Sequence, residues 1–332
     1  MRAWQVHEHG EPQHVLTLAE VPEPSPGPGQ ILVRVLAAAA NFPDALLCRG
    51  TYQVRPPLPF CPGVELCGEI VTAGERVSGF APGDRVIGGA VLPYGGFAEY
   101  ALMDGRMIMP APDVLDDASA APFHITYQTG WFGLHRRARL EAGETLLVHA
   151  AAGGVGSGAV QLGKAAGAFV IGVTGGAAKA EVAASLGADV VIDRTREDIV
   201  EVVKSVTGGK GADVVYDPVG GDAFAKSIKC IAFEGRIVIV GFASGQIPSA
   251  ALNHALVKNY SILGLHWGLY QAKDPAAIRD CHTRLVKLAA DGAIKPLVSE
   301  RLGLADVPSG LQRLADGATT GRIVFSPGQD RS

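Results

Sequence analysis

The segment with the clearest chemical signature is HAAAGGVGSGAVQLGKAAG, residues 149–167. Small residues there match the pattern G-x-G-x-x-G in two registers, one beginning at Ala151 and the other at Gly154. Small residues at this spacing allow a tight turn, let the backbone approach a pyrophosphate closely, and point a helix N-terminus at its charge. The chemistry that this segment could serve is therefore the binding of a dinucleotide.

The residues around this turn predict the elements that position it. Residues 145–150 (TLLVHA) form a short apolar run, which is typical of a buried strand. Residues 157–166 contain no proline and predict a helix that Gly167 ends. A glycine turn between a strand and a helix is the setting in which this motif binds a dinucleotide. Residues 145–163 carry no Asp, Glu, Lys or Arg, but their glycine content does not fit a membrane helix.

After the motif, the chain alternates between predicted strands and helices. The strands are residues 169–174, 190–193, 213–217, 236–240 and 261–265, and the helices are 179–186, 198–207 and a segment that ends at Cys230. Strands that alternate with helices of about ten residues predict βαβ units and a parallel sheet. We therefore expect an α/β fold, with a doubly wound (Rossmann) domain at residues 125–266 whose ligand lies at the carboxyl ends of the strands.

The residues that follow the second strand of this domain favour NADPH over NADH. An NAD site usually places Asp or Glu about 20 residues after the glycine turn, where it holds the ribose 2′-hydroxyl. The corresponding segment, TGGAAK at 174–179, has no acidic residue and ends in Lys179. Arg194, which follows the third strand, adds a planar donor group that is suited to a phosphate.

The rest of the chain predicts a different architecture. Residues 21–30 form a Pro/Gly-rich turn before the alternating strand ILVRV, and PGVELCGEIVTAG, PGDRVIG and AEYALMDG add short strands bounded by glycine. Near the C-terminus, helices are predicted at 282–291 and 307–316, and strands at 296–299 and 322–325. We expect residues 1–124 and 267–332 to form a second, irregular β-rich domain.

The composition argues against several classes of function. The 332 residues carry a net charge of −4 and no extended run of Lys or Arg, which argues against nucleic acid as a partner. The five cysteines are scattered, and an odd number without a C-x-x-C pair indicates free thiols rather than disulfides or a structural zinc site. The N-terminal residues MRAWQVHEHGEP lack the apolar core of a signal peptide. We therefore expect a cytoplasmic enzyme without a membrane segment.

Several segments together carry a resemblance to a known family. They are NFPDALLCRGTY (41–52), PFCPGVELCGEI (59–70), AAGGVGSGAVQLGKAAGA (151–168), GADVVYDPVGGDAF (211–224) and GRIVIVGFASGQIP (235–248). From about Arg2 to Phe325 the chain resembles the medium-chain dehydrogenase/reductase superfamily, and within it the zinc-independent NADPH:quinone oxidoreductase (zeta-crystallin-like) branch. The resemblance implies a GroES-like catalytic domain beside the Rossmann domain, and a homodimer. The sixth strand, at the expected sheet edge, also favours pairing between two copies.

The alcohol dehydrogenases of this superfamily hold a catalytic zinc, and the matching positions here bear on the chemistry. Asn41 stands at the position of the family's cysteine ligand and Val64 at that of its histidine, and neither can replace a thiolate or an imidazole. Asp44 and Glu65 are retained, whereas residues 93–110, where the structural zinc lobe would lie, contain no cysteine. We therefore expect no metal.

The expected loss of zinc selects the substrate class. Without a Lewis acid to stabilise an alkoxide, the substrate should already be electrophilic. We therefore predict hydride transfer from nicotinamide C4 of NADPH to a quinone, with neutral hydrogen-bond donors at the substrate oxygen. An α,β-unsaturated carbonyl or an enoyl thioester such as acryloyl-CoA is an alternative substrate. A non-catalytic NADPH-binding sensor or structural protein is the alternative from another class.

The candidate site residues follow from the motif, the strand ends and the resemblance. Asn41 and Tyr52 are expected to contact the substrate oxygen, and Asp44 to orient the pocket wall or a water. By the resemblance, Thr126 and Tyr127 contact the nicotinamide or the substrate. The predicted cofactor-binding residues lie at the glycine turn or close after strand ends: Ala151, Gly153, Gly154, Val155, Gly156, Thr174, Gly175, Lys179, Arg194, Asp217, Gly241 and Phe242.

Overall fold

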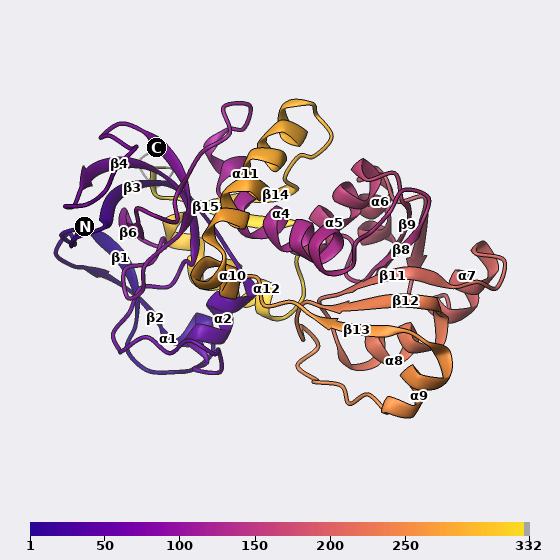
Figure 1. Cartoon of the computed structure of the whole chain (residues 1–332). Helices are drawn as coiled ribbons and strands as arrows, with labels where there is room; N and C mark the ends of the chain where they lie inside the picture. The colour runs from indigo at the N-terminus through magenta and orange to yellow at the C-terminus, as the bar shows by residue number, and fades with distance from the viewer. Residues whose placement is uncertain (329–332) are drawn as a thin grey trace. The chain divides into compact units, whose positions relative to one another are not determined.

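The computed structural model describes residues 1–328, which divide into two compact units (Figure 1). Unit 1 comprises Met1–Ile125 and the chain from Pro296 onward, and unit 2 comprises Thr126–Lys295. The second boundary lies at 295, whereas the sequence patterns placed it at 266. Gln128 accounts for the difference, because its side chain donates to the Ile278 carbonyl and accepts from the Trp267 indole. These contacts hold residues 267–295 in unit 2.

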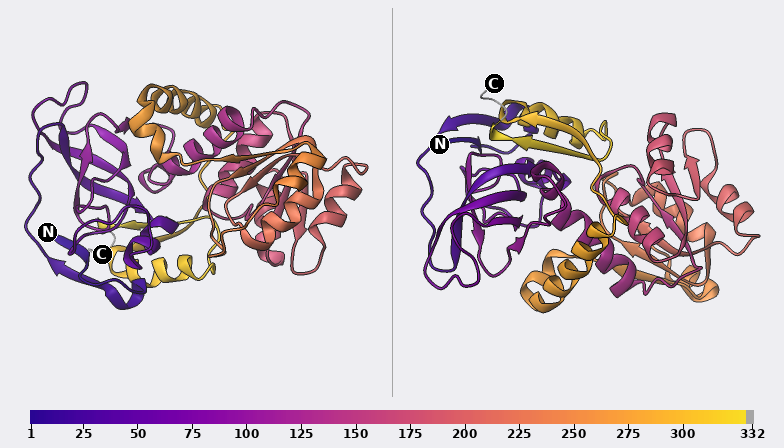
Figure 2. Two further views of the ribbon diagram at one scale, coloured as in Figure 1. Left: turned by 60° about the horizontal axis from the view of Figure 1, so that its bottom comes forward. Right: turned by 90° about the horizontal axis from the view of Figure 1, so that it is seen from above.

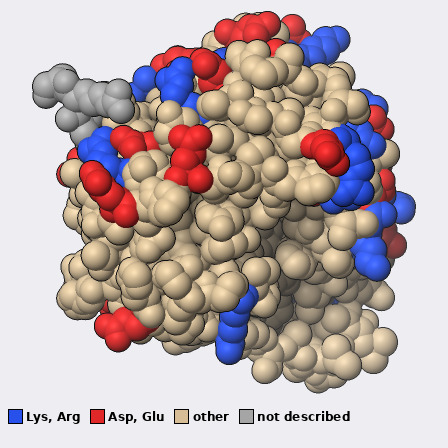
Figure 3. Space-filling view, turned by 90° about the vertical axis from the view of Figure 1, so that its left-hand side faces the viewer, with Lys and Arg blue, Asp and Glu red and all other residues tan. Residues whose placement is uncertain are grey.

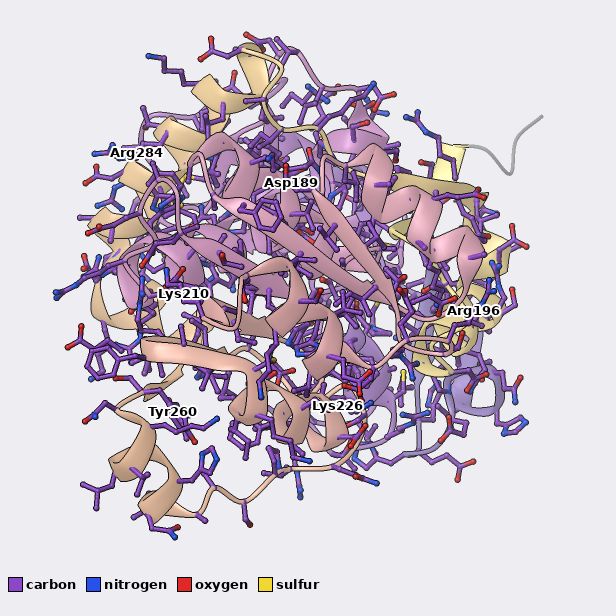
Figure 4. All side chains as sticks on the ribbon, turned by 90° about the vertical axis from the view of Figure 1, so that its right-hand side faces the viewer. Asp189, Arg196, Lys210, Lys226, Tyr260 and Arg284 are labelled. Carbon is purple, nitrogen blue, oxygen red and sulfur yellow. The ribbon has the colours of Figure 1, made fainter. Side chains whose placement is uncertain are left out.

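Unit 2 is built on six parallel strands in the order β10-β9-β8-β11-β12-β13. Their bounds are β8 Thr145–Val148, β9 Phe169–Thr174, β10 Val190–Asp193, β11 Ala212–Asp217, β12 Ile231–Ile239 and β13 Ser261–Gly264. The chain order reverses between β8 and β11, and such a switch point is where doubly wound sheets bind their ligands. In Figure 4, Arg196, which follows β10, and Lys210, which precedes β11, mark opposite ends of the strands.

Helices cover both faces of this sheet. In Figure 1, α5 (Gly154–Ala165) and α6 (Ala177–Ser185) lie on one side and α8 (Gly221–Cys230) lies on the other. The other helices of unit 2 are η1 Phe132–Arg137, α7 Ile199–Val206, α9 Leu252–Lys258, α10 Gly268–Lys273 and α11 Pro275–Ala290, and α4 Phe123–Trp131 begins in unit 1 and continues into unit 2. Strand residues such as Leu147, Ile171, Val215 and Ile237 form the buried apolar core.

The predicted α/β fold is confirmed, and most elements of unit 2 lie within a few residues of their predicted bounds. Strands 169–174 and 190–193 begin and end as predicted. β8 stops at Val148, two residues early, because Ala150 adopts a left-handed backbone conformation (φ 50°) that turns the chain. α5 begins at Gly154, three residues before the predicted start, so the glycine turn itself forms the first turn of the helix.

Unit 1 contains a seven-stranded sheet in the order β14-β15-β3-β4-β5-β7, with β6 paired to β3, and a separate β1-β2 pair. The strands are β1 Arg2–Val6, β2 Leu16–Glu20, β3 Gln30–Ala39, β4 Glu65–Ala73, β5 Arg85–Gly89, β6 Tyr100–Asp104, β7 Met109–Pro110, β14 Val298–Gly303 and β15 Arg322–Ser326. The helices are α1 Pro12–Val15, α2 Phe42–Cys48, α3 Asp117–Ala120, η2 Leu304–Asp306 and α12 Val307–Ala315.

The register of three strands gathers the polar residues of unit 1. β3 pairs antiparallel with β4, which places Ala39 opposite Glu65, and with β15, which places Ala39 opposite Val324. In the right-hand view of Figure 2, the yellow C-terminal strands lie beside the indigo N-terminal strands. The last residues of β3 and the first residues of β4 and β15 therefore meet at one place.

One face of the molecule is drawn with its charged residues marked in Figure 3. On the face drawn in Figure 3, most of the surface is uncharged, and acidic and basic residues are intermingled. Among residues 1–328, no helix has both the length and the apolar character that are needed to cross a membrane.

Candidate active site

A buried polar cluster lies at the end of β3 in unit 1. Arg322, the first residue of β15, donates from Nη2 to Asn41 Oδ1 and to Glu65 Oε2, both at 2.7 Å. Asn41 Nδ2 donates to Glu65 Oε2 at 3.0 Å and to the Ala39 carbonyl at 3.1 Å. All three side-chain groups are buried. Both hydrogens of the Asn41 amide are thus used within the protein.

The ion pair in this cluster is shielded from water. Burial is the largest effect on both partners, and it raises the pKa of Glu65 and lowers the pKa of Arg322. Each charge compensates part of the free-energy cost of removing the other from water. Removing either partner would therefore leave an unpaired buried charge, which is destabilising. Glu65 Oε1 also accepts from the backbone N–H of Ile125 at 2.6 Å, the last residue of unit 1 before the chain enters unit 2.

Hydrogen bonds to the Asp44 carboxylate connect the start of α2 to the turn before β4. Its Oδ1 accepts from the backbone N–H groups of Gly63 and Val64, and its Oδ2 from that of Asn41, each at 2.9 Å. A side chain at residue 63 is excluded, because Gly63 has φ +101° and an added Cβ would lie 2.5 Å from the nitrogen of Phe97. Burial raises the pKa of Asp44 to about 6, although the three N–H groups act in the opposite direction. Its contacts suit the predicted role of shaping the pocket wall.

The raised pKa of Asp44 predicts how stability depends on pH. Because this pKa, about 6, lies above that of an unfolded aspartate at about 3.9, the folded protein binds the extra proton between these pH values. The contribution of Asp44 to stability is therefore largest at acidic pH and declines as the pH rises to about 6. We expect the free-energy difference between wild type and Asp44→Asn to be larger at pH 4.5 than at pH 7, by about 2 kcal/mol. Urea unfolding at both pH values measures it, and an equal difference at both would contradict the assignment.

Tyr52 is the predicted substrate contact whose hydrogen-bond donor is free. Its ring packs half-buried against the apolar core of unit 1. Its hydroxyl forms no hydrogen bond with any residue of the described chain. Burial, and then the nearby charge of Asp44, raise the pKa of Tyr52, so the hydroxyl keeps its proton at neutral pH. Contact of Asn41 with substrate stays a prediction, and it would require one of the amide hydrogens to leave its present acceptor.

Thr126 and Tyr127 lie at the start of unit 2 and differ in their surroundings. Tyr127 is completely buried, and its hydroxyl donates to Gln161 Oε1 of α5 at 3.3 Å. This contact favours a packing role for Tyr127 over the predicted ligand contact. The hydroxyl of Thr126 is buried and has no partner within residues 1–328, and its methyl lies 2.8 Å from the position of a Cβ on Gly158. Thr126 thus carries an unused polar group beside the helix that follows the glycine turn.

The glycine turn has the geometry of a phosphate-binding turn. Gly153 caps the N-terminus of α5, which begins at Gly154. A Cβ on Gly156 would lie 2.1 Å from the Ala150 carbonyl oxygen, so this position excludes any side chain. The N–H of Ala151 bonds to the Val173 carbonyl of the neighbouring strand. Because α5 already begins at Gly154, only the register that begins at Ala151 includes the turn before the helix. The residues fit a dinucleotide whose pyrophosphate meets the start of α5.

The end of β9 holds the residues predicted to select the cofactor. The Thr174 hydroxyl is buried without a partner in the described chain. The Arg194 guanidinium lies over Gly175, since a Cβ there would be 3.1 Å from Arg194 Nη2. Lys179 is half-buried in the first turn of α6. Asp193, the last residue of the neighbouring strand β10, accepts with Oδ1 from the N–H of Gly176 and from Thr195, so it shapes the turn.

The ends of β11 and β12 complete this side of unit 2. Asp217 is fully buried, and its Oδ1 accepts from the backbone N–H groups of Val219 and Gly220. Its Oδ2 has no partner within residues 1–328. Phe242 follows β12, and its ring lies against Gly220, where a Cβ would be 2.8 Å from the ring. All the predicted cofactor residues thus lie at the carboxyl ends of the strands, at the glycine turn, or in the segments that follow them.

Comparison with known proteins places the chain in a family. Residues 27–113 match the alcohol dehydrogenase GroES-like domain, and residues 154–283 match the family described as zinc-binding dehydrogenase. A quinone oxidoreductase-like protein 2 homolog from Nematostella vectensis is 39% identical over 306 residues, which cover 91% of this chain and 83% of that protein. The chain belongs to the quinone oxidoreductase branch of the medium-chain dehydrogenase/reductase superfamily. The predicted family is therefore confirmed.

Solved structures of similar proteins agree with this assignment. The Escherichia coli quinone oxidoreductase complexed with NADPH has a TM-score of 0.91 and 31% identity, covering 98% of this chain and all of that chain. A mycobacterial protein complexed with NADPH has a TM-score of 0.91 and 30% identity, with the same coverage. The two-domain fold, a nucleotide-binding domain joined to a GroES-like domain, is thus shared along nearly the whole length of the chain.

The donor groups of this member do not fit a catalytic zinc ion. Asn41 Oδ1 and Glu65 Oε2 already accept from the Arg322 guanidinium at 2.7 Å, and Val64 has no donor atom in its side chain. A metal ion at these oxygens would be repelled by the positive charge of Arg322. Asn41 and Val64 supply neither a thiolate nor an imidazole to coordinate the ion. Within residues 1–328, no three His, Cys, Asp or Glu side chains are grouped so that they could hold a metal ion.

Two features of the site are not predicted by the sequence patterns. The patterns predict only a strand at Arg322, although an arginine inside the apolar run GRIVF is unusual enough to suggest a buried partner. Asp193 was treated as the end of a strand, although its carboxylate fixes the turn beside Gly175. The role of Arg322 depends on contacts with segments that are distant along the chain, whereas Asp193 contacts Gly176, only 17 residues away.

Proposed function

We propose that this protein reduces quinones with NADPH by a metal-independent hydride transfer. The observation that carries this proposal is the Arg322 guanidinium, which is hydrogen-bonded to Asn41 and Glu65 where related alcohol dehydrogenases gather ligands for zinc. An acceptor that needs no Lewis acid suits such a site, and a quinone delocalises the arriving charge onto its oxygen. The similarity to quinone oxidoreductases supports the same substrate class.

The residues of this chain would have distinct roles in binding NADPH and in contacting the quinone. The glycine turn and the start of α5 hold the pyrophosphate of NADPH, while Thr174 and Asp217 offer buried polar atoms that have no partner in the described chain. When bound, the reduced nicotinamide supplies a hydride. The Tyr52 hydroxyl donates a hydrogen bond to the quinone oxygen on which negative charge develops. Asp44 and the Asn41–Glu65–Arg322 cluster fix α2 and the turn before β4.

NADPH oxidation in chelator-treated buffer, followed by the absorbance of NADPH, tests this function. Parallel reactions would contain 1,4-benzoquinone, a crotonyl thioester, or neither. Turnover with the quinone alone is the expected result. Turnover with the thioester alone would replace the quinone by an enoyl substrate. NADPH binding without turnover of either acceptor would indicate a non-catalytic protein.

Lys179 and Arg194 are proposed to make this chain select NADPH over NADH. Both lie beside the end of β9, where an acid would otherwise hold the ribose 2′-hydroxyl. Replacing either residue with alanine is expected to raise the KM for NADPH about tenfold, because a hydrogen bond to a charged phosphate is lost. The KM for NADH should change less than about twofold. Lys164→Ala, which removes a cation paired to Asp189 (labelled in Figure 4), is the control; equal effects of all three variants would contradict the assignment.

We also propose that two copies associate through the edge of the unit 2 sheet. β13 is the last strand of that sheet, and its Ile262 side chain is partly exposed. Nearby in the sequence, Leu252, Leu256 and Val257 of α9 are 76–80% exposed, which is unusual for large apolar side chains. Light scattering should give twice the mass of one chain for wild type and for the control Leu18→Lys. Ile262→Lys should give the mass of a single chain, and a single-chain mass for wild type would overturn the proposal.

A further inference from the structure

A hollow of about 560 Å³ in unit 2 lies away from the proposed cofactor residues. Its lining comes from the end of η1, the turn before β8, and residues within β12 and β13: Arg136, Arg137, Ala138, Arg139, Glu141, Glu144, Arg236 and Leu263. Glu144 and Arg236 lie toward the amino ends of the parallel strands, the end marked by Lys210 in Figure 4, and the hollow extends along β13 to Leu263. The glycine turn and the other cofactor residues lie at the carboxyl ends. We call this hollow the arginine hollow.

Part of the arginine hollow is a fixed floor. Arg236 donates from Nη1 and Nη2 to the two carboxylate oxygens of Glu144 at 2.8 and 2.7 Å. Its Nε donates to the Ala138 carbonyl, and Nη2 also lies 3.3 Å from the Arg139 carbonyl. Arg236 and Glu144 are about one-fifth exposed, and together they are electrically neutral. The floor therefore holds the backbone of residues 138–139 without offering a free charge to a ligand.

The rim carries charged side chains that form no ion pair within residues 1–328. Arg137 donates from Nε to the Gly264 carbonyl at 3.1 Å, which fixes the guanidinium and leaves both Nη groups without a partner within residues 1–328. The side chains of Arg139 and Glu141 are exposed and have no hydrogen bond or ion pair there. Arg136, in contrast, is paired with Asp274. The free groups are thus two guanidinium ions and one carboxylate.

The backbone at Arg139 adopts a conformation that is strained for a residue other than glycine. Arg139 has φ +51°, in the left-handed region that favours glycine. Glycine would adopt this conformation without strain. Arginine at this position therefore lowers the stability of the chain slightly, and it places a positive charge at the rim of the hollow. Strain of this kind is found most often at ligand-binding positions.

We propose that the arginine hollow binds a phosphate ester that carries hydroxyl groups, such as a sugar phosphate. Two guanidinium groups suit the oxygens of a phosphate, to which arginine binds with charge-assisted hydrogen bonds. Glu141 would repel a bare anion but accepts hydrogen bonds from hydroxyl groups. The volume is sufficient for a small ligand of this class. This site is separate from the cofactor site and does not depend on the proposed quinone reduction.

Calorimetric titration of the NADP⁺-saturated protein with ribose 5-phosphate tests the proposal. Saturation with NADP⁺ blocks the phosphate-binding groups at the carboxyl ends, and about 0.15 M salt suppresses non-specific attraction. We expect one site per chain with a dissociation constant below about 1 mM. Arg137→Gln combined with Arg139→Gln should weaken binding at least about tenfold. Arg279→Gln, which removes an exposed charge from α11 of the same unit, is the matched control and should change affinity less than about twofold.

Two further variants separate the specific proposal from simple charge attraction. Glu141→Gln should weaken ribose 5-phosphate but not inorganic phosphate, because only the sugar has alcohol hydroxyl groups to donate to the carboxylate, whereas the carboxylate repels the phosphate anion. Arg139→Gly should raise Tm by roughly 1–3 °C while it weakens ribose 5-phosphate. Absence of binding at millimolar concentration would overturn the proposal. So would an equal effect of Arg279→Gln, a Glu141→Gln variant that treats both ligands alike, or binding that weakens as NADP⁺ is increased.

Discussion

Replacing Arg322 with methionine is expected to lower the free energy of unfolding by about 3–5 kcal/mol. The substitution leaves Glu65 buried without its cation, and burial already raises the pKa of that carboxyl. It also removes the donor that holds Asn41 Oδ1. Because α2 is then less well fixed, we expect kcat/KM to fall about 100-fold in the protein that remains folded. Urea unfolding and NADPH oxidation measure the two effects.

Two controls separate the buried pair from ordinary surface charge. Arg313→Met removes a cation from an exposed pair with Glu300 and should cost less than about 1 kcal/mol. The double variant Arg322→Met with Glu65→Gln has no uncompensated buried charge, so it should recover much of the lost stability. If it recovers stability but not activity, the cluster positions Asn41 and α2 as well as holding the fold. A cost of Arg322→Met as small as that of Arg313→Met would contradict the importance of the buried pair.

Replacing Tyr52 with phenylalanine is expected to lower kcat for quinone reduction by about 100- to 1,000-fold, as removal of an oxyanion donor does in other enzymes. Tyr52 is the predicted substrate contact with an unused hydroxyl, whereas the Asn41 amide hydrogens already have acceptors. The ring would remain in place, so stability should change little. Steady-state kinetics with NADPH and 1,4-benzoquinone measure the effect.

The KM for NADPH separates the proposed role of Tyr52 from a general disturbance of the site. It should be unchanged in Tyr52→Phe, because the hydroxyl is proposed to act on the quinone oxygen. Tyr94→Phe, a tyrosine of the same unit that is 43% exposed, is the matched control and should retain full activity. Full kcat in Tyr52→Phe would show that another group stabilises the quinone oxygen.

The sequence predicted unit 2 well because its elements depend on local patterns. Apolar runs such as 169–174 and 190–193 end at turn residues, and the strand bounds follow them directly. The glycine turn was predictable for a similar reason, since the residues that shape it are neighbours in the chain. Residues 267–295 were assigned to the other domain because their packing depends on Gln128, far away in sequence.

The active-site cluster was only partly predictable, for a physical reason. Asn41 and Asp44 were found by their types and by the family resemblance, but their hydrogen-bond partners depend on strand register. The pairing of β3 with β4 and β15 sets which side chains meet, and this pairing is not encoded in any one short segment. The sequence therefore predicted Asn41 as a site residue, but it did not predict that the Asn41 amide is hydrogen-bonded to Arg322 and Glu65.

The two oxygens of Glu65 have a consequence for the order in which the protein can be completed during synthesis. One oxygen accepts from Ile125, where the chain leaves unit 1, and the other from Arg322, after the chain has returned to it. Arg322 leaves the ribosome 257 residues after Glu65, and the whole of unit 2 is made in between. Unit 2 is one continuous stretch and can fold during that interval, as domains generally fold as units. Unit 1, although its chain starts first, can reach its final stability only after unit 2 has been made.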